Sequence, residues 1–265
     1  MIKLIASDLD GTLLHGGEQS LSPRALNLVR RLIEKGVRFI AASGRQYDNE
    51  RRLFGDIQDD ISYIAENGAL CAHNGQILFR HTLDEDLRLR IITEIRKRPD
   101  CDILLSRADA SVIEGTNPAF VNHIRNVMKN TTEIVDDVAN AKGPFIKIAV
   151  ANMTGGPQAL QEYLQHLQEM FSPEIRAVTS GNFWIDFIPP NVNKGTALQM
   201  FLDYFNIRPD ECAALGDQQN DIEMLELAGS GYAMSCAAPG VAKHAAYTAD
   251  CAEDVLEKLL EEPEY

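Results

Sequence analysis

Two aspartates near the start of the chain have the types and spacing to hold a cation and to act on phosphate. Asp8 and Asp10 bracket Leu9 in the stretch MIKLIASDLDGTLL, and Gly11 and Thr12 follow at once. Residues two apart in a strand point to the same side, so a strand that runs into Asp8 would deliver both carboxylates to one place. Like charges at short range conflict, and a hard cation such as Mg²⁺ removes that conflict.

With Mg²⁺ and a phosphate present, such a pair supports two-step phosphoryl transfer. One aspartate can attack phosphorus and form an aspartyl-phosphate. The other can protonate the leaving oxygen and later activate water. The structural alternative is that both aspartates only cap a turn.

The elements that must position this pair are those of an open α/β sheet. The apolar runs Ile2–Ala6 and Val37–Ala42 predict two strands of a parallel sheet. Between them, Ser22 and Pro23 predict the start of a helix, and Gly36 predicts its end. Ligands bind at the carboxyl ends of strands in such sheets, which is where the two aspartates are expected.

The second predicted strand also ends in polar residues, Ser43-Gly44-Arg45. A small hydroxyl and a glycine at a strand end can present O–H and N–H donors to a phosphate oxygen, although Ser-Gly is also an ordinary turn. Arg45 can pair with the phosphate or with an acid of the substrate, and the alternative is a surface arginine.

Two further segments, late in the chain, carry candidate site residues. Lys194 opens a predicted helix, where a cation opposes the helix dipole unless an anion binds there; otherwise it is a solvated surface lysine. Asp217 follows a strand predicted at Cys212–Leu215 and can supply a third oxygen ligand to the cation. Asn220 and Asp221 can bind metal-bound water, orient the lysine, or simply cap the next helix.

Four segments of the chain resemble, in order, the signatures of the haloacid dehalogenase superfamily of phosphatases. They are DLDGTLL, Ser43 in AASGR, Lys194 in NVNKGTAL, and LGDQQND from Leu215 to Asp221. The arrangement is most similar to the Cof-type sugar-phosphate phosphatase branch, whose cap is inserted between the second and third signatures. The resemblance implies a Rossmann-like, parallel-sheet α/β core (residues 1–81 and 186–265) with an inserted α/β cap that sets substrate specificity (residues 82–185).

The resemblance also implies a role for each matched residue. Asp8 would be the nucleophile and Asp10 the acid and base, while Asp8, the Asp10 carbonyl and Asp217 would hold Mg²⁺. The phosphate would be bound by Thr12, Ser43, Gly44 and Lys194. Arg45, Asn220 and Asp221 would contact the substrate or support these residues.

The function expected is Mg²⁺-dependent hydrolysis of small phosphate monoesters, with sugar phosphates as the first choice. The alternatives are a phosphosugar mutase that uses the same aspartyl-phosphate, and a non-catalytic sugar-phosphate sensor. Relatives differ in leaving group: hexose phosphates, other small sugar phosphates and pyridoxal phosphate. Polar cap residues that could select it are Arg107, His123, Arg125 and Asn182.

Two features around the signatures qualify this interpretation. Asn67-Gly68 and Asn74-Gly75 predict hairpin turns, read here as a flap that closes the first part of the core. The chain departs from the family at Ser235-Cys236-Ala237, where relatives usually have Gly-Asn-Ala, and at Ala252–Val255, where they have a longer glycine-containing segment. Both departures bear on substrate shape rather than on the chemistry.

Composition limits the partners. The formal net charge of −14 argues against nucleic acid, and it requires a locally positive site for an anionic substrate. No apolar run approaches the ~20 residues of a membrane span. The five cysteines and six histidines show no zinc-ligand spacing, so the cysteines are expected to be ordinary reduced thiols of a cytoplasmic protein.

Overall fold

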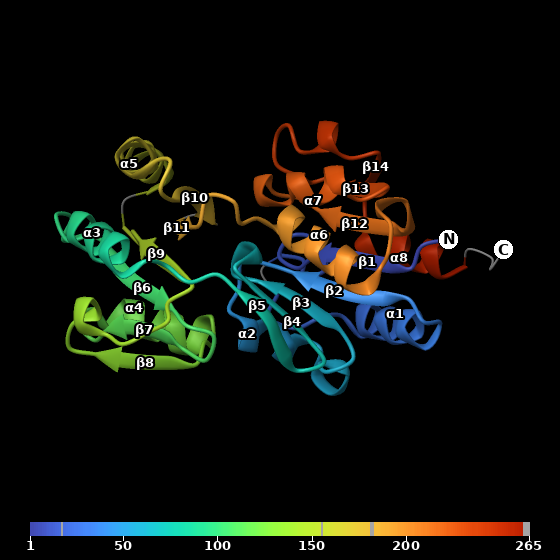
Figure 1. The fold of residues 1–265 in the computed structure, drawn as a ribbon, viewed down its shortest axis with the longest axis horizontal. Coiled ribbons are helices and arrows are strands. Elements are labelled where there is room, and N and C mark those ends of the chain that lie inside the picture. The colour runs from blue at the N-terminus through green and yellow to red at the C-terminus, as the bar shows by residue number, and fades with distance from the viewer. Residues whose placement is uncertain (17, 155, 181–182, 262–265) are drawn as a thin grey trace. The chain divides into compact units, whose positions relative to one another are not determined.

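The computed structural model describes residues 1–265 except 17, 155, 181–182 and 262–265, so the predicted cap residue Asn182 lies outside the described residues. Contacts divide the chain into two units. Unit 1 comprises Met1–Arg45, Glu50–Phe79 and Asn193–Tyr265, and unit 2 comprises Gln46–Asn49 and Arg80–Val192. Each unit has its own sheet (Figure 1). Each also has its own apolar core.

Unit 1 contains an eight-stranded sheet in the order β14-β13-β12-β1-β2-β3-β4-β5. Its strands are β1 (Leu4–Asp8), β2 (Arg38–Ala42), β3 (Ser62–Ala65), β4 (Leu70–His73), β5 (Gln76–Arg80), β12 (Cys212–Gly216), β13 (Ser230–Met234) and β14 (Tyr247–Ala249). Neighbouring strands from β14 to β3 are parallel, and β4 runs antiparallel to β3. The predicted α/β class with a parallel-sheet core is therefore confirmed.

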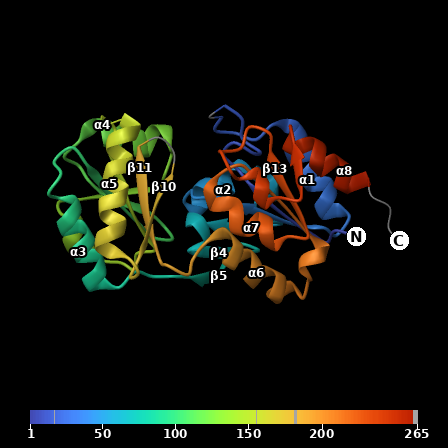
Figure 2. The same cartoon turned by 90° about the horizontal axis from the view of Figure 1, so that it is seen from above.

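Helices lie on both faces of this sheet (Figure 2). They are α1 (Pro23–Glu34), α2 (Tyr47–Leu53), α6 (Lys194–Phe205), α7 (Ile222–Leu227) and α8 (Ala252–Glu261). On one face, Phe201 of α6 and Met224 of α7 pack with Leu4 of β1. Ile5, the next residue of β1, is buried on the opposite face, where α1 packs against β2 and α8.

The local sequence explains how the first β-α-β segment forms. Ser22 accepts a hydrogen bond from the backbone N–H of Ala25 at 2.9 Å and so caps α1, as predicted. Gly36 follows α1 with a φ of +79°, the conformation expected of a glycine after a helix end. The chain is thereby reversed into β2, which pairs in parallel with β1 from Leu4↔Arg38 to Asp8↔Ala42.

The predicted hairpin occupies a different place from the one expected. Asn74 and Gly75 have φ angles of +51° and +72°, which suit a type I′ turn between β4 and β5. These two strands continue the central sheet beyond β3 and form its edge. The hairpin expected as a flap that closes the first part of the core is therefore part of the sheet itself, because β4 pairs with the edge of β3.

Unit 2 contains a six-stranded sheet in the order β10-β11-β9-β6-β7-β8. Its strands are β6 (Asp102–Ser106), β7 (Ser111–Glu114), β8 (Thr132–Val135), β9 (Lys147–Ala151), β10 (Arg176–Ser180) and β11 (Trp184–Ile188). Its helices are α3 (Glu85–Ile95), α4 (Pro118–Asn122) and α5 (Gly156–Phe171). β11 pairs with both β9 and β10, so the strand belongs as a whole to unit 2.

Both faces of the second sheet are covered. Ile92 of α3 and Leu167 of α5 pack with Ile148 of β9 on one face. Phe120 of α4 packs with Ala149 on the other. Beyond Asn122, α4 continues as a π-helical turn, η3 (His123–Val127). No helix among the described residues is long and apolar enough to cross a membrane.

Candidate active site

The pairing of β1 with β12 brings two of the predicted acidic residues to the same edge of the sheet. Ser7 of β1 is in register with Leu215 of β12, so Asp8 and Asp217 both emerge at the carboxyl end. Gly11 passes directly beside them with a φ of +95°. A Cβ on Gly11 would lie 2.4 Å from Oδ2 of Asp217, so only glycine permits this close approach.

Lys194 lies between two of the carboxylates. It is the first residue of α6, whose start is fixed by the capping interactions of Asn193. Its side chain is fully buried, and Nζ donates to Oδ1 of Asp8 at 2.5 Å and to Oδ1 of Asp221 at 2.6 Å. Burial alone would lower the pKa of Lys194, but the charges of Asp221 and Asp8 outweigh it and raise the pKa.

The carboxylate of Asp221 is committed to protein partners on both sides. Its Oδ1 accepts from Lys194, and its Oδ2 accepts the backbone N–H groups of Asp217 at 2.9 Å and Gln218 at 2.8 Å. Asp221 therefore fixes the lysine and the loop after β12. Of the alternatives left open by the sequence, this geometry matches the one in which Asp221 orients Lys194.

Asp8 keeps one oxygen free. Its Oδ2 is buried and has no hydrogen-bond partner among the described residues. Burial raises the pKa of Asp8 well above its ordinary value; Lys194 opposes this, and the charges of Asp221 and Asp217 add to it. A buried carboxylate oxygen without a partner is costly, and a cation or an electrophile bound there would remove the cost.

Asp8, Asp217 and Asp221 form a cluster that could hold a metal ion. One carboxylate oxygen from each lies within 4.8 Å of the others. Asp217 accepts from the hydroxyl of Thr12 at 3.1 Å and from the side-chain amide of Gln218 at 2.6 Å. Burial raises the pKa of Asp217. Three carboxylates around one ammonium leave an excess of negative charge, which an oxygen-preferring divalent cation would neutralise.

Asp10 lies outside this cluster. Its carboxylate accepts from Nε of Arg45 at 2.7 Å and from Nη2 at 2.6 Å, and its side chain is 50% exposed. Arg45 also donates to the side-chain oxygen of Gln19 at 3.2 Å. The guanidinium thus forms a bidentate pair with a predicted catalytic residue, and neither interpretation of Arg45, as a phosphate or substrate ligand or as a surface arginine, is tested by this contact.

The predicted phosphate ligands lie at the same sheet edge. Thr12 is buried, with its hydroxyl on Asp217 and its N–H on the carbonyl of Leu9 at 3.2 Å. Ser43 is also buried, and its hydroxyl oxygen accepts the N–H of Arg45 at 3.1 Å. That contact leaves the hydroxyl hydrogen of Ser43 for an acceptor such as a phosphate oxygen.

Asn67 connects two of the signatures, which sequence reasoning did not predict. It adopts a left-handed conformation in η2 (Glu66–Gly68), with φ of +57°, as a turn-forming asparagine does. Its Oδ1 accepts from Nδ2 of Asn220 at 2.9 Å, and its side chain lies 3.1 Å from where a Cβ on Gly44 would stand. The Asn-Gly pair signalled the turn, but nothing local signalled the partner.

Sequence reasoning also missed two buried acids in unit 1. Glu50 is fully buried, and neither of its carboxylate oxygens has a hydrogen-bond partner among the described residues. Glu66 is 2% exposed and has a φ of +52°. Burial, with a contribution from Glu66, raises the pKa of Glu50 well above its ordinary value. Glu50 lies in the polar segment of α2, and Glu66 opens the turn between β3 and β4, so the sequence carries no signal for the burial of either.

The chain's departure from the family pattern after β13 lies beside the acidic cluster. The N–H of Ala238 donates to the carbonyl of Asp217 at 2.8 Å, and the Sγ of Cys236 lies 3.9 Å from the carbonyl of Gly11. The cysteine therefore stands at the rim of the candidate site.

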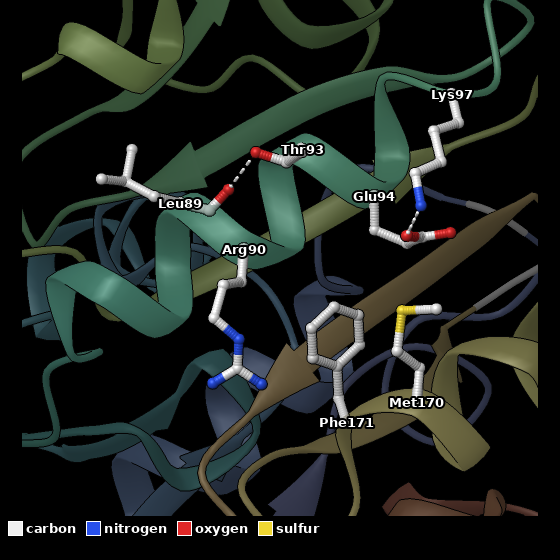
Figure 3. Close-up of a pocket in the computed structure, with 7 residues that line it drawn as sticks. All are labelled: Leu89, Arg90, Thr93, Glu94, Lys97, Met170 and Phe171. Atoms are coloured by element: carbon white, nitrogen blue, oxygen red, sulfur yellow. Dashed lines mark hydrogen bonds and ion pairs between the residues drawn. The ribbon is translucent and has the colours of Figure 1, made fainter.

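A separate pocket of about 460 Å³ occurs on unit 2 and contains none of the predicted site residues (Figure 3). It lies between α3 and the end of α5 and is lined by Leu89, Arg90, Thr93, Glu94, Lys97, Met170 and Phe171. Three of its polar side chains are engaged locally: Thr93 donates to the carbonyl of Leu89, and Lys97 pairs with Glu94. The candidate chemistry is thus at the sheet edge of unit 1.

Comparison with known proteins agrees with this geometry. The family model of haloacid dehalogenase-like hydrolases matches residues 5–258. The chain belongs to this family. The predicted haloacid dehalogenase superfamily is therefore confirmed, and with it the prediction of a hydrolase.

Similar proteins match over nearly the whole chain. The 5-amino-6-(5-phospho-D-ribitylamino)uracil phosphatase YbjI of Escherichia coli (strain K12) is 28% identical over 98% of this chain and 96% of its own. The HMP-PP phosphatase of Citrobacter koseri is 28% identical over 90% and 86%. A crystal structure from Eubacterium rectale is 31% identical and covers 97% of this chain and 99% of its own, with a TM-score of 0.85.

Proposed function

We propose that this haloacid dehalogenase-like hydrolase is a Mg²⁺-dependent phosphatase that hydrolyses small phosphate monoesters, sugar phosphates first among them, through an aspartyl-phosphate on Asp8. The observation that carries the proposal is the state of Asp8: one oxygen is anchored by Lys194, and the other is buried beside Asp217 with no hydrogen-bond partner in the part of the chain that the structure describes. Named relatives are phosphatases of small phosphorylated molecules, which supports the substrate class.

The residues present fit a divalent cation. The free Oδ2 of Asp8 and the side chain of Asp217 are oxygen ligands, and the absence of a Cβ on Gly11 leaves room beside them. We infer that Asp8, Asp217 and the Asp10 carbonyl hold Mg²⁺. The ion would supply positive charge to the phosphoryl oxygens, which is what phosphoryl transfer chiefly asks of an enzyme.

The first step forms a bond between a carboxylate oxygen of Asp8 and phosphorus and breaks the bond to the leaving oxygen. Asp10 gives its proton to that oxygen. In this structure Asp10 is held by Arg45. Because a guanidinium binds phosphate as well as carboxylate, an incoming substrate can take over Arg45 and release Asp10. The released carboxylate takes up a proton from solvent, and this is the proton that it gives to the leaving oxygen.

The second step restores the enzyme. Asp10, now a carboxylate, takes a proton from water as the water attacks phosphorus, and the bond to Asp8 breaks. Lys194, Ser43, Gly44 and Thr12 are proposed to bind the phosphoryl oxygens during both steps. Asn220 and Asp221 hold this arrangement through their contacts with Asn67 and Lys194. Residues 82–185 are proposed to select the leaving group.

The test is phosphate release from a panel of phosphate monoesters, measured with Mg²⁺ and with EDTA. The panel contains hexose phosphates, smaller sugar phosphates, 5-amino-6-(5-phospho-D-ribitylamino)uracil and pyridoxal phosphate. We expect Mg²⁺-dependent release from one or a few of them, and no release by Asp8→Asn with its fold intact. Wild-type activity in Asp8→Asn would refute the assignment of Asp8 as the nucleophile. Isomerised product without free phosphate would indicate a mutase.

A further inference from the structure

A second group of potential metal ligands lies at the start of α8 and shares no residue with the acidic cluster. Nε2 of His15 lies 3.4 Å from Oε2 of Glu253. Sγ of Cys251 lies 3.1 Å from the same oxygen. The ligand atoms of all three residues lie within 4.8 Å of one another. The group thus offers one nitrogen, one sulfur and one oxygen around a common point.

These separations match those of a tetrahedral zinc site. With Zn–N, Zn–O and Zn–S bonds of about 2.0, 2.0 and 2.3 Å, tetrahedral angles place N and O about 3.3 Å apart and S and O about 3.5 Å apart. The observed 3.4 Å and 3.1 Å differ from these values by a few tenths of an ångström. Little rearrangement is needed to bring the three atoms to bonding distance of one ion.

The surroundings hold the carboxylate in place for this role. Glu253 is 4% exposed, and its Oε1 accepts from the hydroxyl of Ser22 at 2.9 Å, which leaves Oε2 to face the other two residues. Ligating carboxylates in metal sites are commonly held by such a hydrogen bond. Ser22 is itself fixed as the N-cap of α1. The side chain of His15 is 49% exposed, so solvent has access to the cluster.

We propose that His15, Cys251 and Glu253 form a binding site for a first-row transition metal ion, with Zn²⁺ as the ion that suits their N, S and O atoms. Three protein ligands leave the fourth position for water. The site is distinct in chemistry from the all-oxygen cluster at Asp8, which suits Mg²⁺. The bound ion would tie the segment after β1 to the start of α8, residues that are more than 230 positions apart in the sequence.

The experiment uses the untagged full chain, freed of metal and titrated with Co²⁺ in the presence of excess Mg²⁺, which occupies the oxygen cluster. Co²⁺ substitutes for Zn²⁺ and reports a thiolate ligand through a charge-transfer band in the near ultraviolet. We expect one equivalent of Co²⁺ to give this band, and Zn²⁺ to abolish it by displacement. Cys251→Ser should lose the band, and Ser22→Ala should weaken binding about 10-fold.

The matched controls are Cys236→Ser and His244→Ala, which remove an exposed thiol and a partly exposed imidazole elsewhere in unit 1. Both should bind Co²⁺ like the wild type. If Cys251→Ser does not fold, His15→Ala makes the same test, since its ring is half exposed and its removal should weaken binding at least about 10-fold. The proposal is overturned if the wild type gives no thiolate band, if the band survives in Cys251→Ser, or if His15→Ala binds Co²⁺ as tightly as the wild type; the three residues would then be a hydrogen-bonded contact only.

Discussion

Lys194 and Asp8 form a buried ion pair although 186 positions separate them in the sequence. The ammonium is fully buried, the carboxylate side chain is 7% exposed, and 2.5 Å separates Nζ from Oδ1. Asp221 accepts a second bond from the same ammonium. Burying these charges is costly for folding, so each depends strongly on the others. The pair therefore ties the stability of unit 1 to the residue proposed to attack phosphorus.

Removal of the ammonium should affect stability and activity together. In Lys194→Met, Asp8 and Asp221 would remain buried without their cation. We expect the free energy of unfolding to fall by about 3–5 kcal/mol and phosphate release to be lost. Urea denaturation and the phosphate assay measure the two effects. Lys3→Met is the control, because Lys3 is half exposed and pairs with Glu211 at the surface. The free energy of unfolding of this variant should hardly differ from that of the wild type. Equal stability of the two variants would contradict the assigned pair.

Asp10→Asn should slow both chemical steps, but not equally for all substrates. We expect turnover of sugar phosphates to fall by about 10²–10⁴-fold, the usual contribution of an acid or base. A phenolic leaving group needs little protonation, so nitrophenyl phosphate should still transfer its phosphoryl group and then stall. Stopped-flow absorbance should show a burst of nitrophenol close to one equivalent. Asp56→Asn, which alters a surface pair with Arg30, serves as control. Absence of a burst, with turnover like wild type, would refute the role of Asp10.

Alanine substitutions at two glycines with positive φ angles can distinguish the effect of backbone strain from the effect of crowding at the site. Gly11 and Gly16 have φ of +95° and +60°, so alanine should cost about 1–2 kcal/mol of stability at either position. A Cβ on Gly11 would also strike Asp217, whereas no atom of the described residues, chain neighbours aside, lies within 4 Å of a Cβ on Gly16. We therefore expect Gly11→Ala alone to lower Mg²⁺ affinity, by about 10-fold or more, in isothermal titration. Equal Mg²⁺ affinity in the two variants would mean that Asp217 is not a ligand.

Elements with a strong local signal were predictable. The apolar run before Asp8, the Ser22-Pro23 cap and the strand before Ser43 each specify their structure within a few residues. Parallel pairing then places the strand ends together, so the proximity of Asp8 and Asp217 followed from the sequence. The position of Lys194 at the same site was predicted from the resemblance of its segment, NVNKGTAL, to a family signature.

Elements and contacts that depend on distant partners were not predictable. α2 is short and polar, with the sequence YDNERRL, and has no clear helical periodicity; β8 is the edge strand of its sheet and largely exposed. Side-chain partners posed the same difficulty. Two contacts join loops from different parts of the chain: Arg45 pairs with Asp10, and Asn220 pairs with Asn67. No spacing in the sequence indicates either contact.

Glu50 provides the pH-dependent prediction. Burial, with a contribution from Glu66, raises its pKa, so the folded protein retains a proton that the unfolded chain releases above the ordinary pKa of glutamate. Between those two pKa values the folded state binds more protons, and stability must fall as pH rises. Glu50→Gln removes this titration with little change in shape.

We therefore expect Glu50→Gln to gain stability relative to wild type as pH rises above about 4.5, the ordinary pKa of glutamate. Urea denaturation at a series of pH values measures the difference in the free energy of unfolding between the two proteins. Other titrating groups are common to both and cancel in this difference. Glu34→Gln on the exposed surface of α1 is the matched control, and its difference from wild type should stay flat. A difference for Glu50→Gln that is equally flat would mean that Glu50 is ionised in the folded protein, so that its burial would need a cation not yet identified.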